Sequence, residues 1–172
     1  WVREGGSLIG FSEHFPFDIA VSGLLETFGI STSIGITIDH DFSNESAGEI
    51  VFEGERLDKR HPIVAGKRSV TKVASYGGSA LSGDGYTNIM KLSDHSMNVS
   101  RNWMGVEAGP LGRGNSQGLA GFYGGGRIAA FGDSNGFAAM IFEDDISKDF
   151  VGMNDETYDW RNLVLNTFDW LS

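Results

Sequence analysis

Three adjacent residues near the start of the chain carry the groups of nucleophilic and acid–base chemistry. Ser12, Glu13 and His14 directly follow the apolar run Ser7–Phe11, which has the composition of a buried strand. A hydroxyl beside an imidazole can act as a nucleophile, and a carboxylate beside an imidazole can move protons. The run therefore predicts reactive groups delivered to the rim of a sheet, with a simple polar turn as the alternative.

A second polar run stands in the same position relative to a later apolar stretch. Asp133, Ser134 and Asn135 directly follow Arg127–Phe131. In open α/β sheets, ligands bind beyond the carboxyl ends of the strands, and polar groups from two strand ends make a better site than either alone. We therefore expect the two runs to meet at one concave site, with Ser134 and Asn135 contacting the ligand.

The same residues can be drawn as a small hydrolase of the esterase or amidase type. Ser12 or a water molecule would attack, His14 would act as base, and Asp133 would orient it. Glu13 would be a further acid–base group. The geometry is awkward, because side chains two residues apart in a turn rarely face one another. The alternative is that Ser12 caps the following segment and His14 packs beside Phe15.

The stretch "FGDSNG" offers a different serine as nucleophile. It resembles the nucleophile block of GDSL-type esterases, in which a serine follows glycine and aspartate after a strand. In that family the block opens the domain and a D-x-x-H motif closes it. Here Ser134 lies near the end of the chain and no histidine follows His95. A helix cap formed around Asp133 is the better interpretation.

Apolar periodicity and glycine punctuation predict alternating strands and helices. The expected elements are strands at Ser7–Phe11, Ile30–Ile38, Glu49–Phe52, Ser69–Ser75, Thr87–Leu92, Leu119–Tyr123 and Arg127–Phe131, and helices at Ile19–Phe28 and Asp159–Leu171. Asp18 is the expected N-cap of the first helix. This order favours an α/β fold: a three-layer sandwich with a largely parallel, flavodoxin- or Rossmann-like central sheet. The first and last strands are expected to be central neighbours.

The terminal helix has the strongest amphipathic pattern in the chain. We expect Leu163, Phe168 and Leu171 to be buried against the sheet. Asn154 and Asp159 lie before and at the first turn of this helix, where polar side chains cap and pair. We expect both to tie the start of the helix to the polar strand ends, with structural bracing as the better interpretation of their role and ligand binding as the alternative.

Composition limits the classes of function. The chain has 172 residues, which suits one domain over residues 1–172, and 40% of them are hydrophobic. Its 23 acidic residues outnumber its 13 lysines and arginines, and this net charge of −10 argues against nucleic acid as a partner. No apolar run approaches the ~20 residues of a membrane helix, so membrane insertion is not expected. The absence of cysteine excludes disulfides, thiolate metal sites and cysteine nucleophiles.

The remaining polar segments are interpreted as loops. The acidic stretches Asp39–Ser46 and Glu143–Asp149 hold oxygen atoms that calcium could use, but neither matches an EF-hand loop, and solvated loops are the better interpretation. The histidines show no metal-ligand spacing, so neither a metal nor a cofactor is expected. Gly105–Gly118 is expected to be a long flexible loop.

Longer stretches at both ends of the chain carry a family resemblance. In "WVREGGSLIGFSEHFPFDIAVSGLLETFGI" a helix end runs into a glycine pair, a strand and a sharp turn, and "GRIAAFGDSNGF" with "NLVLNTFDWLS" reads as a closing strand and helix. These stretches resemble the class I glutamine-amidotransferase-like superfamily. The segments "EHFPF", "HPIVAG" and "GMNDETYDWRNLVLNTFDWL" are similar to its non-glutaminase branches. These are the GldG/intraflagellar-transport type, the trehalose-utilisation type and uncharacterised secreted bacterial proteins with a "DH-PF" turn.

The resemblance implies a domain without glutaminase activity. The superfamily's cysteine stands in a G-x-C-x-G turn, where this chain has "GFSEH" with Ser12 at the cysteine position. The histidine and glutamate that activate the cysteine follow the later strand, where this chain has "DSN". The resemblance thus implies a non-glutaminase domain that binds a small molecule or a partner at the carboxyl edge of the sheet. The small hydrolase is the alternative.

The resemblance also implies that the opening β-α units of the superfamily are missing from this chain. A sheet edge left open in this way needs cover, either from a homo-oligomer or from further N-terminal elements. Its similarity to secreted proteins implies a soluble protein in an extracytoplasmic location.

Overall fold

A computed structural model of the protein describes residues 1–39, 41, 49–102, 105–110, 114–144 and 147–172. The helices are α1 (Phe17–Glu26), α2 (Pro62–Ala65) and α3 (Trp160–Leu171), with short 3-10 turns η1 (Val2–Glu4), η2 (Gly54–Arg56) and η3 (Asn135–Phe137). The strands are β1 (Ser7–Phe11), β2 (Ser31–Thr32), β3 (Ile36–Asp39), β4 (Glu49–Glu53), β5 (Lys72–Tyr76), β6 (Leu81–Ser82), β7 (Thr87–Lys91), β8 (Ser96–Asn102), β9 (Gly105–Pro110), β10 (Ser116–Tyr123), β11 (Gly126–Phe131), β12 (Ala139–Glu143) and β13 (Lys148–Gly152).

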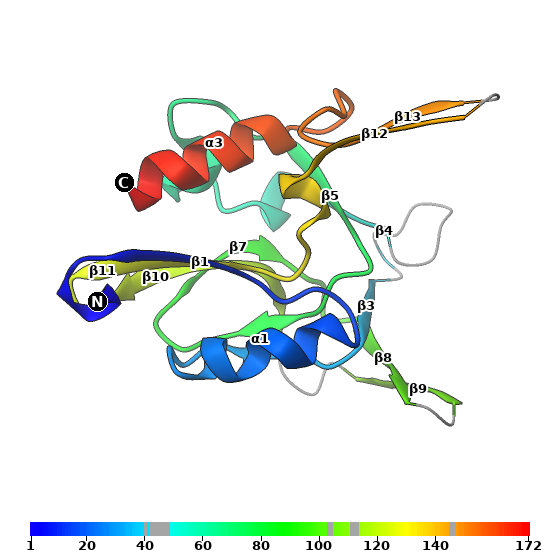
Figure 1. Ribbon diagram of the computed structural model, residues 1–172, viewed down its shortest axis with the longest axis horizontal. Coiled ribbons are helices and arrows are strands. Elements are labelled where there is room, and N and C mark those ends of the chain that lie inside the picture. The colour runs from blue at the N-terminus through cyan, green and yellow to red at the C-terminus, as the bar shows by residue number, and fades with distance from the viewer. Residues whose placement is uncertain (40, 42–48, 103–104, 111–113, 145–146) are drawn as a thin grey trace.

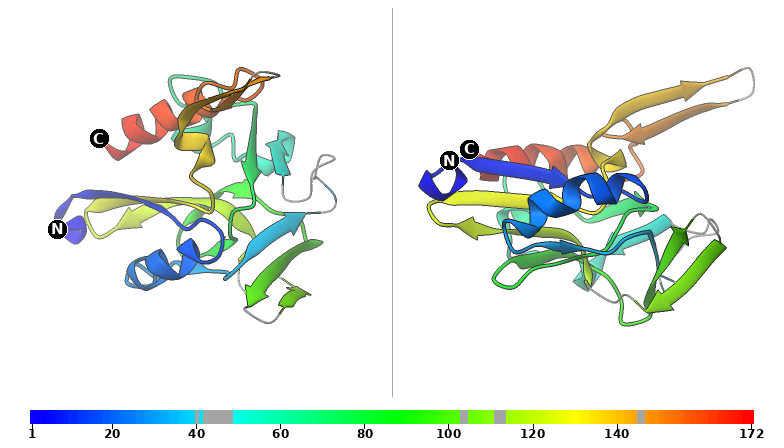
Figure 2. Two further views of the ribbon diagram at one scale, coloured as in Figure 1. Left: turned by 45° about the vertical axis from the view of Figure 1, so that its right-hand side comes forward. Right: turned by 60° about the horizontal axis from the view of Figure 1, so that its bottom comes forward.

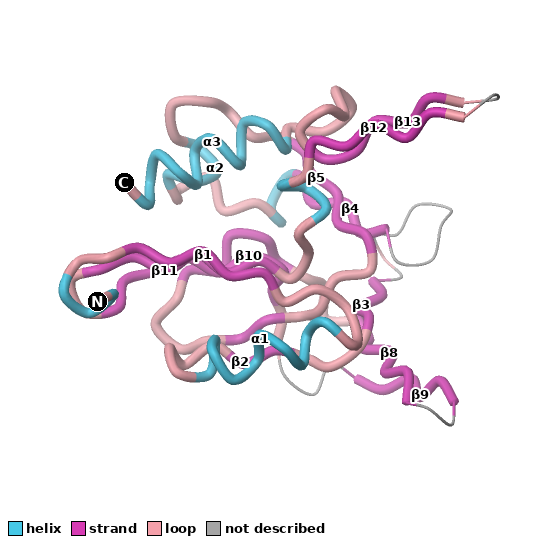
Figure 3. The backbone as a smooth tube through the Cα atoms, in the orientation of Figure 1, coloured by secondary structure: helices cyan, strands magenta, loops and turns pink. Residues whose placement is uncertain are grey.

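The central sheet has the strand order β1-β11-β10-β6-β2, with β7 also paired to β10. β1 and β11 run parallel, from Ser7 opposite Arg127 to Phe11 opposite Phe131, which confirms that they are neighbours. The remaining pairings are antiparallel. The expectation of a largely parallel sheet is therefore corrected: the sheet is curled and mostly antiparallel, and β1 lies at its edge (Figure 3).

The short connection between β10 and β11 accounts for one of these antiparallel pairings. Tyr123 pairs with Gly126, so only Gly124 and Gly125 join the two strands. A two-residue connection can only form an antiparallel hairpin, because a parallel pair needs a crossover of about a dozen residues. Gly124 has a φ of +63°, a conformation that glycine adopts without steric cost.

Helices lie on both sides of the sheet, with α1 on one side and α3 on the other (Figures 1 and 2). Alternate residues of β11 point to opposite sides. Ile128 and Ala130 pack in the cluster that includes Leu25 of α1. Ala129 and Phe131 pack in the cluster that holds α2 and α3. Burial on both faces accounts for the uninterrupted apolar run in β11.

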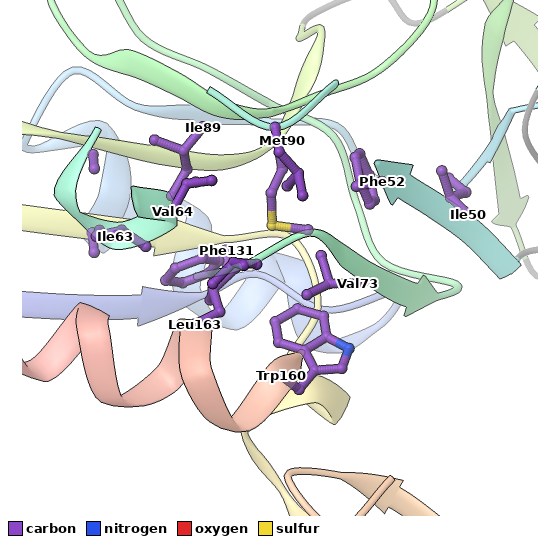
Figure 4. Packing of buried hydrophobic residues seen from close by; sticks show 14 of the residues in the cluster. Ile50, Phe52, Ile63, Val64, Val73, Ile89, Met90, Phe131, Trp160 and Leu163 are labelled. Carbon is purple, nitrogen blue, oxygen red and sulfur yellow. The ribbon is translucent and has the colours of Figure 1, made fainter. Parts of the chain in front are cut away.

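The larger hydrophobic cluster fastens α3 to the sheet. Trp160 and Leu163 pack from α3 toward Phe131 of β11 (Figure 4). Trp160 is 1% exposed, and its Nε1–H donates to the carbonyl oxygen of Ala74 in β5 at 2.8 Å. The indole therefore combines a large buried area with a satisfied donor, which fixes the start of α3.

One position of α3 differs from the predicted stripe. Leu163 is fully buried and Leu171 is partly buried, as expected, but Phe168 is 54% exposed. Thr167 takes the inward position instead: its side chain is fully buried and its hydroxyl donates to the carbonyl of Leu163 at 2.8 Å. A threonine can fill this buried site because its hydroxyl donates a hydrogen bond to a backbone carbonyl of the same helix.

Asp18 is not the N-cap of α1. The helix begins one residue earlier, at Phe17, with Pro16 in the N-cap position. The Asp18 carboxylate is fully buried and accepts hydrogen bonds from Ile19 N–H at 2.8 Å and Gly35 N–H at 2.7 Å. It therefore ties the first turn of α1 to the segment before β3.

All three predicted loops contain regular structure; in Glu143–Asp149, β12 ends at Glu143 and β13 begins at Lys148. Within Gly105–Gly118, β9 occupies the first residues and β10 begins at Ser116. The acidic stretch that begins at Asp39 is not solvated there: Asp39 ends β3, is fully buried and pairs with Arg56 at 2.9 Å. The following residues, 40 and 42–48, lie outside the described part of the chain, as do 145–146 in the other acidic stretch.

Candidate functional site

Ser12 is held inside the protein at the end of β1. Its backbone N–H donates to the carbonyl of Phe131 at 2.8 Å, which extends the pairing of β1 and β11 by one residue. The side chain is fully buried, and its hydroxyl accepts a hydrogen bond from Ser79 Oγ at 2.6 Å. This environment stabilises the strand end and gives the Ser12 hydroxyl no exposure to solvent.

Glu13 occupies the sharp turn that follows. Its φ of +62° makes it the one non-glycine residue with a positive φ in the described part of the chain. Such a conformation costs a glutamate about 1–2 kcal/mol. Its Oε1 accepts a hydrogen bond from Ser134 N–H at 2.5 Å, which joins the two strand ends directly. In α/β-hydrolases the nucleophilic serine sits at a strained turn of this kind. Here the strained residue is Glu13, one residue beyond Ser12.

His14 bonds to its own turn. Its ring Nδ1–H donates to the carbonyl of Phe15 at 2.8 Å, since a carbonyl oxygen can only accept. The ring is half-buried and meets the ring of Phe17 edge-on, with the centroids 5.5 Å apart. This bond leaves Nε2 as the acceptor of the neutral imidazole.

Asp133 is the most enclosed of the predicted site residues with a charge. It is 2% exposed, and its Oδ2 accepts from Tyr76 N–H at 2.5 Å. Its Oδ1 accepts from both the backbone N–H and the side-chain Nδ2 of Asn135, each at 2.8 Å. Burial raises the pKa of Asp133 to about 6; the charge of Glu13 acts in the same direction, and the hydrogen bonds from Tyr76 and Asn135 oppose it.

A third segment, residues 77–79, crosses both strand ends. Ser79 donates its hydroxyl to Ser12, and its N–H donates to the carbonyl of Gly132 at 2.9 Å. Glycine is required at position 132, because a Cβ there would collide with the Ser79 carbonyl oxygen. The sequence signal for this segment is the run "SYGGS", a further polar turn after a predicted strand.

The carboxyl edge is acidic. Among the described residues, no lysine or arginine forms an ion pair with Glu13, Asp133 or Asp18. Burial also raises the pKa of Asp18, against the hydrogen bonds from Gly35 and Ile19 that favour its charged form. The charge of His14 also opposes the rise in the pKa of Asp18, so the imidazole is the nearby side chain that can offset part of this negative charge.

The structure brings some of the predicted residues together and separates others. Glu13 bonds to Ser134, and Asp133 bonds to Asn135. A hydrolytic triad needs hydrogen bonds that run from nucleophile to base to carboxylate. Here the hydrogen bonds of His14 and of both carboxylates run to backbone groups or to Asn135 instead.

Asn154 and Asp159 belong to a different part of the surface. Asp159 Oδ2 accepts from the backbone N–H and the hydroxyl of Thr71, each at 2.7 Å, and from Lys72 N–H at 3.2 Å. Asp159 thus ties the start of α3 to the start of β5. Both residues line a hollow of about 300 Å³, together with Tyr158 and other neighbours in residues 153–162. Its lining includes none of the residues at the two polar strand ends.

Two kinds of feature are absent from the described residues. They include no group of three or more histidine, aspartate or glutamate side chains that could hold a metal ion. No helix in that part of the chain has the length and apolarity to span a membrane.

Comparison with known proteins supports the fold. A scan of protein-family models found no match, and a search of curated protein sequences found none either. The solved structure titled "mmIFT52 N-terminal domain" is similar, with a TM-score of 0.58 and 13% identity over 99% of this chain. The chain spans 66% of the length of that structure's chain. At this identity the likeness concerns the fold alone.

Proposed function

We propose that the chain is a non-catalytic amidotransferase-like domain that binds a cationic group of a small molecule or a protein partner at the carboxyl edge of its sheet. One observation carries this proposal: the polar atoms that a hydrolase would need free are engaged inside the protein. The Ser12 hydroxyl is buried against Ser79, and both oxygens of Asp133 accept internal hydrogen bonds. The likeness of the fold to a GldG/intraflagellar-transport type domain favours the same class.

The expected ligand group follows from the charges at this edge. Glu13 is half-buried, and one of its carboxylate oxygens accepts the hydrogen bond from Ser134 N–H. It has no cationic partner among the described residues. The Nε2 atom of His14 offers a second acceptor in the same turn. A guanidinium or ammonium group would supply both the donors and the charge that this turn lacks.

A small hydrolase is the second candidate, and one observation favours it. A carboxyl group with a pKa of about 6, beside a second carboxylate, has the proton affinity of a general acid or base. In this reading Glu13 or His14 would activate water. The low exposure of Asp133, 2%, speaks against direct contact between that carboxyl and a substrate.

Amide NMR with agmatine, which carries a guanidinium and an ammonium group, tests the proposal. We expect agmatine to shift the amide signals of Glu13, His14 and Ser134, and succinate to leave them unchanged. Glu13→Gln should weaken agmatine binding at least fivefold, whereas Glu26→Gln, which changes an exposed carboxylate on α1, should not. Equal responses to agmatine and succinate, or equal effects of the two substitutions, would contradict the proposal.

A further inference from the structure

The ribbon formed by β12 and β13 projects away from the body of the protein (Figures 1 and 2). Its strands pair with each other, from Ala139 opposite Gly152 to Glu143 opposite Lys148, and with no other described strand. Every residue of β12 is exposed. The ribbon is therefore a two-stranded arm without a packed layer on either side.

The arm is unusually apolar for an exposed element. Its large exposed apolar side chains are Met140 at 38%, Ile141 at 51%, Phe142 at 56% and Phe150 at 45%. Opposed residues of an antiparallel pair share a face. By the observed register, Ile141 and Phe150 lie on one face, while Met140 and Phe142 lie on the other. Both faces of the arm are thus apolar.

A two-stranded ribbon of this kind has little to stabilise it in water. An isolated pair of strands is marginal at best, and stability normally needs a third strand or a packed face. Both outer edges of the arm also carry backbone donors and acceptors that no described strand pairs. An added strand would satisfy one edge and cover apolar side chains in the same step.

The charges on the arm indicate what kind of segment fits. Lys148 Nζ forms an ion pair with Glu143 Oε2 at 2.9 Å. Asp149, which lies opposite Phe142, accepts from the hydroxyl of Ser147 at 3.2 Å and has no cationic partner among the described residues. A carboxylate beside exposed apolar groups is complemented by a lysine or arginine set among apolar residues.

We propose that the β12–β13 arm is a docking site for an extended segment of another protein, in which apolar residues are interspersed with lysine or arginine. The segment adds a strand to the arm, covers Phe142 and places a cation beside Asp149. A second copy of the chain fits less well, because it would bring a further net charge of −10 to an acidic surface. This site is independent of the binding proposed at Glu13.

Two synthetic peptides provide the test: acetyl-Lys-Val-Phe-Lys-Val-Ile-Lys-amide and the same sequence with glutamate in place of each lysine. We expect the lysine peptide to bind at least tenfold more tightly by isothermal titration calorimetry and to shift the amide signals of the arm. Phe142→Ser should weaken this binding tenfold or more, and Asp149→Asn should weaken it several-fold and reduce its dependence on salt. Phe168→Ser is the matched control, because Phe168 is 54% exposed on α3, and it should leave binding unchanged.

Several results would overturn the proposal. Failure of the lysine peptide to bind at millimolar concentration would do so, as would equal binding of the glutamate peptide. An equal loss of binding in Phe168→Ser would show that general surface hydrophobicity, rather than the arm, is responsible. Light scattering that finds a dimer in the wild type and a monomer in Phe142→Ser would identify a second copy as the occupant instead.

Discussion

Asp133 should make the protein less stable as the pH rises from about 4 to about 6. Burial raises the pKa of this carboxyl from an ordinary value of 3.8 to about 6 in the folded protein. Between these values the folded chain holds a proton that the unfolded chain has lost, so the free energy of unfolding falls as the pH rises. Each pH unit is worth up to about 1.4 kcal/mol, and the complete titration, from below pH 3 to above pH 7, is worth about 3 kcal/mol.

Urea unfolding, monitored by tryptophan fluorescence at intervals of ~0.5 pH unit between pH 3.5 and pH 7.5, measures this effect. Other carboxyl groups also titrate in this range, so the informative quantity is the stability of the wild type minus that of Asp133→Asn. This difference should fall by about 3 kcal/mol between pH 3.5 and pH 7.5, with about 2 kcal/mol of that fall between pH 4 and pH 6, and should be flat above about pH 7. If Asp133→Asn does not fold, carbon NMR of the Asp133 carboxyl in the wild type gives the pKa directly.

Asp159→Asn is the matched control with the opposite sign. Hydrogen bonds from Thr71 lower the pKa of Asp159 despite its partial burial. Its contribution to stability is therefore present above the unfolded pKa and is lost as the pH falls through the folded pKa. A wild-type minus Asp133→Asn difference that stays constant, or that rises with pH as for Asp159, would refute the reasoning about Asp133.

Three substitutions test the packing. Trp160→Phe should cost about 1–3 kcal/mol in thermal or urea unfolding, because it leaves the carbonyl of Ala74 without its donor in a buried site; a loss below 0.5 kcal/mol would show that the bond is not needed. Phe168→Ala should cost less than about 1 kcal/mol, because the ring is 54% exposed; a loss above 3 kcal/mol would mean that the ring is buried in solution. Arg56→Met should cost about 3–5 kcal/mol, since it leaves the buried Asp39 without its cation, and an unchanged melting temperature would contradict that pairing.

Part of the fold could be predicted because local patterns and tertiary packing agree. The apolar runs at β1 and β11 are continuous because both faces of these strands are covered, and the polar residues that end them do lie together, as the bond from Ser134 to Glu13 shows. The terminal helix was equally readable from its stripe. Phe168 is the one residue of the stripe whose burial was predicted wrongly. Thr167 takes the inward position because its hydroxyl bonds to the helix backbone, and apolar periodicity does not reveal such a bond.

Other features depend on contacts distant in sequence. The hydroxyl of Ser12 is closed off by Ser79, which lies far along the chain, so the reactivity expected of "FSEH" could not be judged from its neighbours. The strained residue of that turn is Glu13 rather than Ser12, and only the backbone conformation shows it. The β12–β13 arm could not be predicted from the sequence, because the acidic residues around Glu143 favour a loop interpretation.

The most direct test of the non-catalytic character of the carboxyl edge is a turnover assay. Small ester and amide probes, such as p-nitrophenyl acetate and acyl-p-nitroanilides, would be incubated with the wild type and with His14→Ala and Glu13→Gln between pH 5 and pH 8. The buried Ser12 and the internally bonded Asp133 predict no turnover above background, and no difference between the wild type and either variant. Wild-type turnover that disappears in His14→Ala, with its folding intact, would contradict the account and establish the hydrolase.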